Sequence, residues 1–231
     1  MKIHYIGDSL TWGLFALPFP DAAYRNVATE LLQAQFPDRT WEGSYGIGGT
    51  LSNAFAASVG INANAINPDI VVMEIGIHDA MGDTTQGAPP GGTPPAIFKT
   101  GYETLLSQIC ANNHRPLMIF LSLWKSTELA QGPAYDVILD AEASARGGYG
   151  IFVDTTDFWL DPTTCGPAGI HYDFVWTNVT DDFHPNAKGH DLLANAICDA
   201  IAATGYYNEG EKIVAECEET DIINVPMGWD R

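Results

Sequence analysis

Short apolar segments rich in β-branched residues alternate with longer amphipathic segments along this chain. The clearest apolar segments are 70–75 (Ile-Val-Val-Met-Glu-Ile) and 116–123 (Pro-Leu-Met-Ile-Phe-Leu-Ser-Leu). A nearly continuous apolar run of this length is typical of a central strand that helices cover on both faces. The alternation therefore predicts an α/β fold, with repeated βα units around a parallel sheet.

This pattern accounts for most of the chain. Strands are expected at 2–6, 40–45, 70–75, 116–123 and 150–154, and helices at 21–36, 97–112, 134–146 and 187–203. Asp21 is the expected N-cap of the first helix, and Pro37 stops it. The 231 residues suit one domain of medium size, which we assign to residues 1–205. Residues 206–231, an acidic tail with interspersed apolar side chains, are expected to be an appendage packed on that domain.

The charge balance excludes several classes of partner. The chain has 10 Lys and Arg residues against 29 Asp and Glu residues, for a formal net charge of −19. Nucleic acids and anionic membrane surfaces are both bound by clustered basic side chains, so neither is an expected partner. No apolar stretch approaches the ~18 residues of a membrane span. The first residues run directly into a predicted strand, so no signal peptide is expected; location stays open between the cytoplasm and export after removal of a leader.

Cysteines and metal ligands give a weaker signal. The four cysteines are widely spaced and form no C-x-x-C pair: Cys110, Cys165, Cys198 and Cys217. Free or buried thiols are favoured over a disulfide from Cys198 or Cys165 to Cys217. A metal centre built on His78, Asp79 and Asp83 lacks a complete ligand set, so neither a metal nor an organic cofactor is expected.

Two short blocks at opposite ends of the chain carry the chemistry. The first predicted strand ends in Gly7-Asp8-Ser9-Leu10, which places Ser9 where open α/β sheets bind ligands. The second block, Asp181-Asp182-Phe183-His184, precedes the last helix. A serine nucleophile needs a base to accept its proton and an acid to orient that base, and Asp181 can reach His184 within one turn.

Together these blocks resemble the SGNH (GDSL) hydrolase family of serine esterases and lipases. The resemblance implies a three-layer α/β/α sandwich of the flavodoxin-like type, with a five-stranded parallel sheet. It implies Ser9 as nucleophile, Asp181 as acid and His184 as base; Asp182 replaces Asp181 only if the local turn differs. The block Ser44-Tyr45-Gly46-Ile47-Gly48-Gly49-Thr50 resembles the family's second block, which implies Gly49, or else Gly48, as an oxyanion-hole residue together with the Ser9 N–H.

The fourth family block departs from its pattern. Where the family has Gly-x-Asn-Asp, this chain has Gly76-Ile77-His78-Asp79. Histidine can also donate a hydrogen bond, so His78 is the expected third oxyanion donor. A structural or substrate-contacting role for His78 is the alternative.

The remaining expectations concern one loop segment and the other histidines. The segment Gln86–Pro95 is rich in Gly and Pro and is expected to border the site or to be a simple surface connection. His171 lies in an aromatic segment that could line the substrate pocket. The remaining histidines are expected to be structural: His4, His114 and His190.

The resemblance and the residues together predict a hydrolase of carboxylic esters that works through an acyl-serine intermediate. Its expected partners are small-molecule or saccharide esters, with short acyl groups or acetylated carbohydrates favoured. Two alternatives stay open: an acyltransferase with the same triad, and a catalytically silent carbohydrate-binding domain.

Overall fold

A five-stranded parallel sheet forms the centre of the molecule. The computed structural model describes residues 1–14, 16, 21–51, 53–111, 114–161, 163–164 and 184–205. The strands are β1 (Lys2–Gly7), β2 (Glu42–Ile47), β3 (Ile70–Glu74), β4 (Leu117–Leu121) and β5 (Gly150–Val153). They pair in the order β2-β1-β3-β4-β5, and every pairing is parallel. The predicted strands are therefore confirmed, each to within about two residues of its expected ends.

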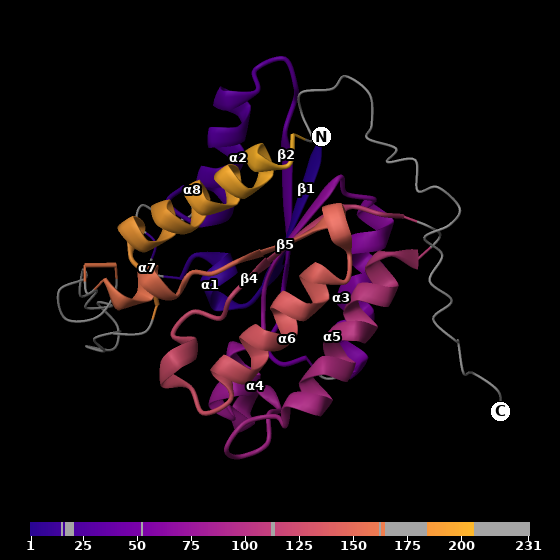
Figure 1. Ribbon diagram of the computed structural model, residues 1–231, viewed down its shortest axis with the longest axis vertical. Helices are drawn as coiled ribbons and strands as arrows, with labels where there is room; N and C mark the ends of the chain where they lie inside the picture. Colours follow the sequence, from indigo (N-terminus) through magenta and orange to yellow (C-terminus); the bar gives the residue numbers. More distant parts are fainter. Residues whose placement is uncertain are drawn as a thin grey trace.

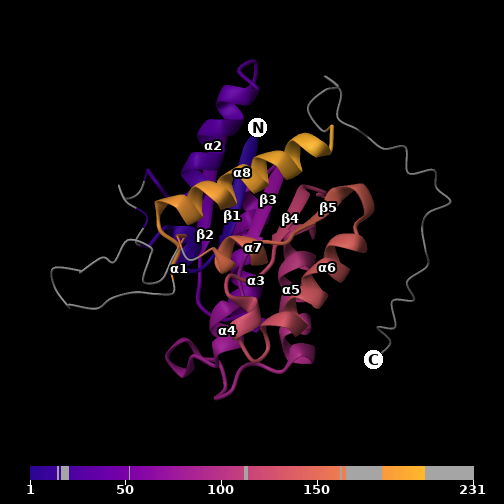
Figure 2. The same ribbon diagram turned by 60° about the vertical axis from the view of Figure 1, so that its left-hand side comes forward.

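Helices cover both faces of the sheet. The α-helices are α1 (Ser9–Trp12), α2 (Tyr24–Gln35), α3 (Asn53–Ile66), α4 (Ile77–Met81), α5 (Pro95–Ile109), α6 (Gly132–Ser144), α7 (Thr156–Leu160) and α8 (Ala187–Ala203). Among the described residues, 3-10 turns accompany them at η1 (Thr84–Gln86), η3 (Ser126–Glu128) and η4 (Gly147–Tyr149). Helices α2 and α8 lie on one face, and α3, α5 and α6 lie on the other (Figures 1 and 2). The expected three-layer α/β/α sandwich is confirmed.

Each face of the sheet has its own apolar core. Along β1, Ile3 and Tyr5 point toward α2 and α8, whereas Ile6 points toward α3 and α5. Along β3 the side chains alternate in the same way: Ile70 and Val72 point toward α2 and α8, and Val71 points toward α3 and α5. Because both faces are buried, the strands are continuously apolar, as the sequence pattern indicated.

Helix α3 was not expected from the sequence. Its interior contains Gly60, Asn62 and Asn64, which are weak helix formers. Packing against α5 explains it: a side chain at position 60 would overlap Gln108 and the carbonyl of Leu105. The glycine thus lets the two helices approach closely, and tertiary contact outweighs local propensity.

The predicted N-cap of α2 was wrong. The helix begins at Tyr24 after Ala23, whose side chain makes no capping hydrogen bond. Asp21 lies in a turn before this point and is exposed, so its carboxylate is too far back along the chain to serve as the cap.

Two further observations concern the described ranges only. No helix there is long and apolar enough to span a membrane. Cys110 and Cys198 are free thiols. The tail at 206–231, Cys165 and Cys217 lie outside the described residues.

Candidate active site

The turn after β1 places Ser9 at the carboxyl edge of the sheet. Asp8 caps the short helix α1, and its Oδ1 accepts a hydrogen bond from the Leu10 N–H at 3.0 Å. Gly7 is required by the close approach of chain segments, since a side chain there would overlap the hydroxyl of Thr11 and the carbonyl of Glu74. In the strand order 2-1-3-4-5, β1 and β3 flank the switch point where such sheets bind ligands.

His184 reaches Ser9 from the other end of the chain. Ser9 Oγ lies 2.8 Å from His184 Nε2, a hydrogen bond between residues 175 positions apart. In this arrangement the hydroxyl can donate to the imidazole, as a nucleophile does to its base. Asp181 and Asp182, the two carboxylates expected to hold the other ring nitrogen, lie outside the described residues.

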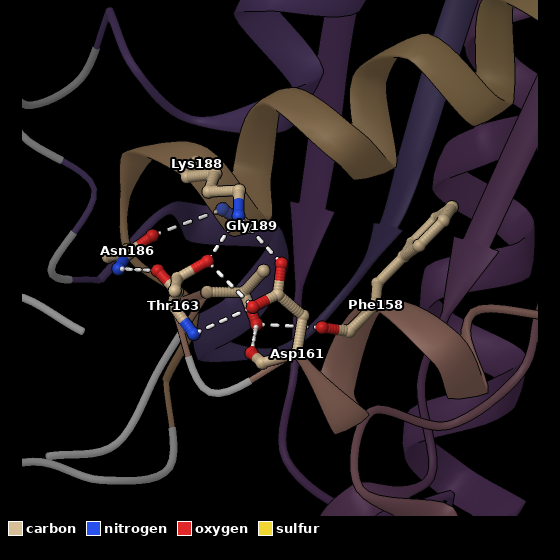
Figure 3. Close-up of polar contacts among 7 residues, drawn as sticks. Phe158, Asp161, Thr163, Asn186, Lys188 and Gly189 are labelled. Atoms are coloured by element: carbon tan, nitrogen blue, oxygen red, sulfur yellow. Dashed lines mark hydrogen bonds and ion pairs between the residues drawn. The ribbon is translucent and has the colours of Figure 1, made fainter. Parts of the chain in front are cut away.

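A network at the start of α8 fixes the segment that carries His184 (Figure 3). Asn186 caps the helix: its Oδ1 accepts from the Gly189 N–H at 3.1 Å. Its Nδ2 donates to the Thr163 carbonyl at 2.9 Å, and its backbone N–H donates to the Thr164 carbonyl at 2.8 Å. Lys188 Nζ forms an ion pair with Asp161 Oδ2 at 2.6 Å. The segment after α7 therefore anchors the chain at His184, three residues before α8 begins at Ala187.

His78 follows β3 and contacts a carboxylate. It lies in α4, and its Nδ1 is 3.0 Å from Asp83 Oδ2. The other Asp83 oxygen accepts hydrogen bonds from the Thr85 hydroxyl at 2.6 Å and the Thr85 N–H at 3.0 Å. These Thr85 bonds, followed by the contact with His78, lower the pKa of Asp83. Asp83 is thus held as a carboxylate against one ring nitrogen of His78.

Gly49 is better placed than Gly48 to supply a backbone donor. The Gly48 N–H donates to the carbonyl of Gly7 at 2.8 Å and is already occupied. Within the ranges that the structure describes, no hydrogen bond is formed by the N–H of Gly49. Buried Asp79 steadies this loop, because its carboxylate accepts from the Leu51 N–H and the Thr93 hydroxyl, each at 2.7 Å.

Two carboxyl groups are buried beneath the turn that carries Ser9. Glu74 is opposite Gly7 in the β1–β3 register, and both Glu74 and Asp8 are almost fully buried. Burial raises the pKa of Asp8 to about 6, although the Leu10 N–H and the nearby imidazoles of His78 and His184 oppose the rise. Burial, and then the charge of Asp8, raise the pKa of Glu74 well above 4.5.

The segment Gln86–Pro95 borders the Gly49 loop. The Gln86 side chain lies against Gly49, and the Thr50 hydroxyl donates to the Gln86 carbonyl at 2.7 Å. Toward its far end, the Thr93 N–H donates to the Asp79 carbonyl at 2.8 Å. The segment is therefore attached through Thr93 to both the backbone and the carboxylate of Asp79, the residue that also bonds the Leu51 N–H.

The other histidines take structural positions, as expected. His4 Nδ1 lies 2.8 Å from Ser44 Oγ, and His114 Nε2 donates to the Pro68 carbonyl at 2.8 Å. His190 stacks on Tyr24 and accepts its N–H at 3.3 Å. His171 lies outside the described residues.

The sequence analysis did not predict that Asp83 and Glu74 lie at the site. Asp83 was considered only as a metal ligand, and Glu74 only as part of an apolar strand. A single acidic residue inside the run 70–75 was a usable signal, because a buried carboxyl group needs a local reason. In the described ranges, no three His, Cys, Asp or Glu side chains gather into a group that could hold a metal ion.

A serine hydroxyl bonded to an imidazole at the switch point of a flavodoxin-like sheet is the arrangement of a serine hydrolase. The chain belongs to the GDSL-like lipase/acylhydrolase family, whose profile matches residues 5–192. Membership makes the domain a carboxylic ester hydrolase. Comparison with curated protein sequences finds no match.

Solved structures share the fold at low sequence identity. The acetyl xylan esterase AlAXEase is 17% identical with a TM-score of 0.64, over 87% of this chain and 100% of its own. LAE5, an α/β hydrolase from the metagenome of Lake Arreo, Spain, is 24% identical with a TM-score of 0.62, over 90% of this chain and 96% of its own. The two-domain esterase CEX, active on acetylated mannans, is 20% identical with a TM-score of 0.60 over 88% of this chain. This chain spans 50% of the length of CEX.

Proposed function

We propose that this protein removes short acyl groups, acetyl foremost, from neutral carbohydrate esters through an acyl-serine intermediate. The observation that carries the proposal is the 2.8 Å contact between Ser9 Oγ and His184 Nε2 at the carboxyl edge of the sheet. Ser9 is the nucleophile, His184 the base and Asp181 the acid that orients the base. The Ser9 N–H, the Gly49 N–H and the His78 side chain receive the oxyanion.

In the first half-reaction, Ser9 Oγ attacks the ester carbonyl carbon while its proton passes to His184 Nε2. The carbonyl oxygen gains the negative charge, which the three donors stabilise more strongly than the starting carbonyl. His184 then gives the proton to the departing alcohol oxygen as the carbon–oxygen bond breaks. The acyl group stays on Ser9.

In the second half-reaction, water replaces the alcohol. His184 removes a proton from the water as its oxygen attacks the acyl carbon, and the same donors receive the charge again. Collapse of the intermediate returns the proton to Ser9 and releases the carboxylic acid. An acceptor alcohol in place of water would give acyl transfer through the same steps.

The preference for a neutral carbohydrate ester rests on charge and on the surface near Ser9. A net charge of −19 disfavours approach by anionic substrates. Trp12 lies three residues after Ser9 in α1 and keeps 41% of its surface exposed. An indole face beside the nucleophile suits the apolar face of a sugar ring. Two proteins of the same fold, AlAXEase and CEX, are described as acting on acetylated xylan and mannan.

The test is a substrate panel with Ser9→Ala as control. Acetylated xylan, acetylated mannan and p-nitrophenyl esters of increasing chain length would be compared by acid release. We expect acetyl esters to be cleaved fastest and Ser9→Ala to be inactive on all. Preference for long acyl chains would contradict the substrate class, and an active Ser9→Ala would contradict the mechanism. Adding an alcohol acceptor and analysing the products separates hydrolysis from acyl transfer.

A further inference from the structure

We propose that Asp83 is a positioning residue, which holds His78 with Nδ1–H toward Asp83 and Nε2 toward the substrate, so that His78 donates to the oxyanion only as an imidazolium. The inference rests on the proposed function and deepens it. It makes one member of the oxyanion hole charged and dependent on pH, where the family's asparagine is neutral.

Asp83 is held in place next to His78. Its Oδ2 lies 3.0 Å from His78 Nδ1, five residues earlier in the chain. Its Oδ1 is held by both the hydroxyl and the N–H of Thr85, and it caps η1. The bonds to Oδ1 therefore hold the carboxylate in place, and Oδ2 faces the imidazole ring of His78.

The contact with Asp83 determines which nitrogen of the His78 ring carries a proton. A carboxylate only accepts hydrogen bonds, so the His78 nitrogen that faces it carries a proton. In the neutral ring the other nitrogen, Nε2, is then a bare acceptor, which would repel an oxyanion. Only the ring with both nitrogens protonated can bond to Asp83 and donate to the oxyanion at the same time.

Several carboxyl groups surround His78. Besides Asp83, the carboxyl groups of two other described residues interact electrostatically with His78: Asp79 in its own helix α4, and Asp8 in the turn after β1. Asp8 also interacts with His184, which places both imidazoles around the same turn as Ser9.

The consequence is a catalytic rate with two limbs. At acid pH the rate falls because His184 must be neutral to act as the base. At alkaline pH the rate falls because His78 loses the proton that it donates. His78→Asn, which restores a neutral donor, should keep the acid limb and lose the alkaline one.

The kinetic test is Asp83→Asn, made in both the wild-type and the His78→Asn protein. In the wild type we expect kcat to fall about tenfold, as for loss of a charge-assisted hydrogen bond at a partly exposed site. In the His78→Asn protein we expect Asp83→Asn to change kcat by less than about twofold. Asp38→Asn is the matched control, because it removes an exposed carboxylate in the turn between α2 and β2.

A second measurement does not depend on activity. Nitrogen-15 chemical shifts of the histidine rings report which nitrogen is protonated, and His78→Asn identifies the signal of His78. At alkaline pH we expect the Nδ1-protonated form in the wild type and its loss in Asp83→Asn. An Nε2-protonated ring in the wild type would overturn the inference.

Two kinetic outcomes would also overturn it: no effect of Asp83→Asn in the wild type, or an equal effect in both backgrounds. The second outcome would mean that Asp83 acts through Thr85 and η1 and not through His78. Failure of the proposed function has a different signature: Ser9→Ala would remain active if the mechanism fails, and long acyl chains would be preferred if the substrate class fails, whatever Asp83→Asn does.

Discussion

The carboxyl groups of Asp8 and Glu74 lie together beneath the turn that carries Ser9, and both are almost fully buried. Asp8 Oδ1 accepts the Leu10 N–H, whereas neither oxygen of Glu74 has a partner of good geometry among the described residues. The backbone N–H of Trp124 only partly offsets the cost of burying the Glu74 charge. Because two buried charges of like sign repel each other, we infer that Glu74 keeps its proton at neutral pH.

This pair predicts a pH-dependent stability. The pKa of Glu74 is raised in the folded protein above its ordinary value of 4.5, so its contribution is complete below that pH and is lost as the pH rises. Glutamine has no proton to lose, so Glu74→Gln does not lose this contribution to stability as the pH rises. The free energy of unfolding of Glu74→Gln relative to wild type should therefore rise with pH, by at most ~1.4 kcal/mol per pH unit. Urea unfolding of both proteins at a series of pH values measures it; a constant difference would show that Glu74 is ionised in the folded state.

His78 is predicted to be an oxyanion donor. Replacing it with alanine should lower kcat by ~10²–10³-fold, as loss of a single oxyanion donor does. His78→Asn should recover much of this loss, because the amide is a neutral donor at the same place. Steady-state kinetics on one short-chain ester would suffice. If His78→Ala matched the wild type, the oxyanion would be left to the backbone of Ser9 and Gly49.

Asp79 is predicted to hold the oxyanion loop in place. Asp79→Asn offers one acceptor oxygen where the carboxylate offers two, so either the Leu51 N–H or the Thr93 hydroxyl loses its partner. We expect the free energy of unfolding to fall by about 2 kcal/mol and kcat to fall with it. Thr93→Val, which breaks only the bond on the side away from Gly49, is the control. It should lower stability with a smaller loss of kcat, and equal losses of kcat would argue against an effect through the loop.

Gly7 is predicted to tolerate no side chain. In Gly7→Ala the added methyl group would overlap Thr11 and the backbone carbonyl of Glu74, neither of which can move freely. Overpacking of this kind costs ~1–3 kcal/mol. Thermal unfolding would show a lower Tm than wild type. Gly148→Ala is the control, since a Cβ there meets no atom within 4 Å. An unchanged Tm for Gly7→Ala would mean that α1 shifts without cost.

The fold could be predicted because local pattern and tertiary environment agree in most of the chain. The apolar run at 70–75 is a buried strand by composition alone, and the last helix was expected at 187–203, where α8 lies. Helix α3 could not be found this way. Its stability comes from the contact of Gly60 with α5, which no local pattern encodes.

The site was predicted in part, for a similar reason. Ser9 and His184 stand in short sequence blocks, and the structure brings them to hydrogen-bond distance. Gly49 was expected ahead of Gly48 from the family resemblance, and the hydrogen bond from Gly48 to Gly7, which joins segments about 40 residues apart, supports that order. The partner of His78 likewise depends on how the chain turns after α4, and sequence spacing alone does not show that Asp83 faces the ring.

The central claim is that Ser9 attacks the ester, and the hydrolysis rate of Ser9→Ala on a short-chain acetyl ester tests it most directly. The account predicts a loss of ~10³-fold or more in kcat, with the fold intact by circular dichroism. Ser107→Ala, which removes an exposed hydroxyl on α5, should keep the full rate. A Ser9→Ala protein that retains most of the wild-type rate would contradict the account.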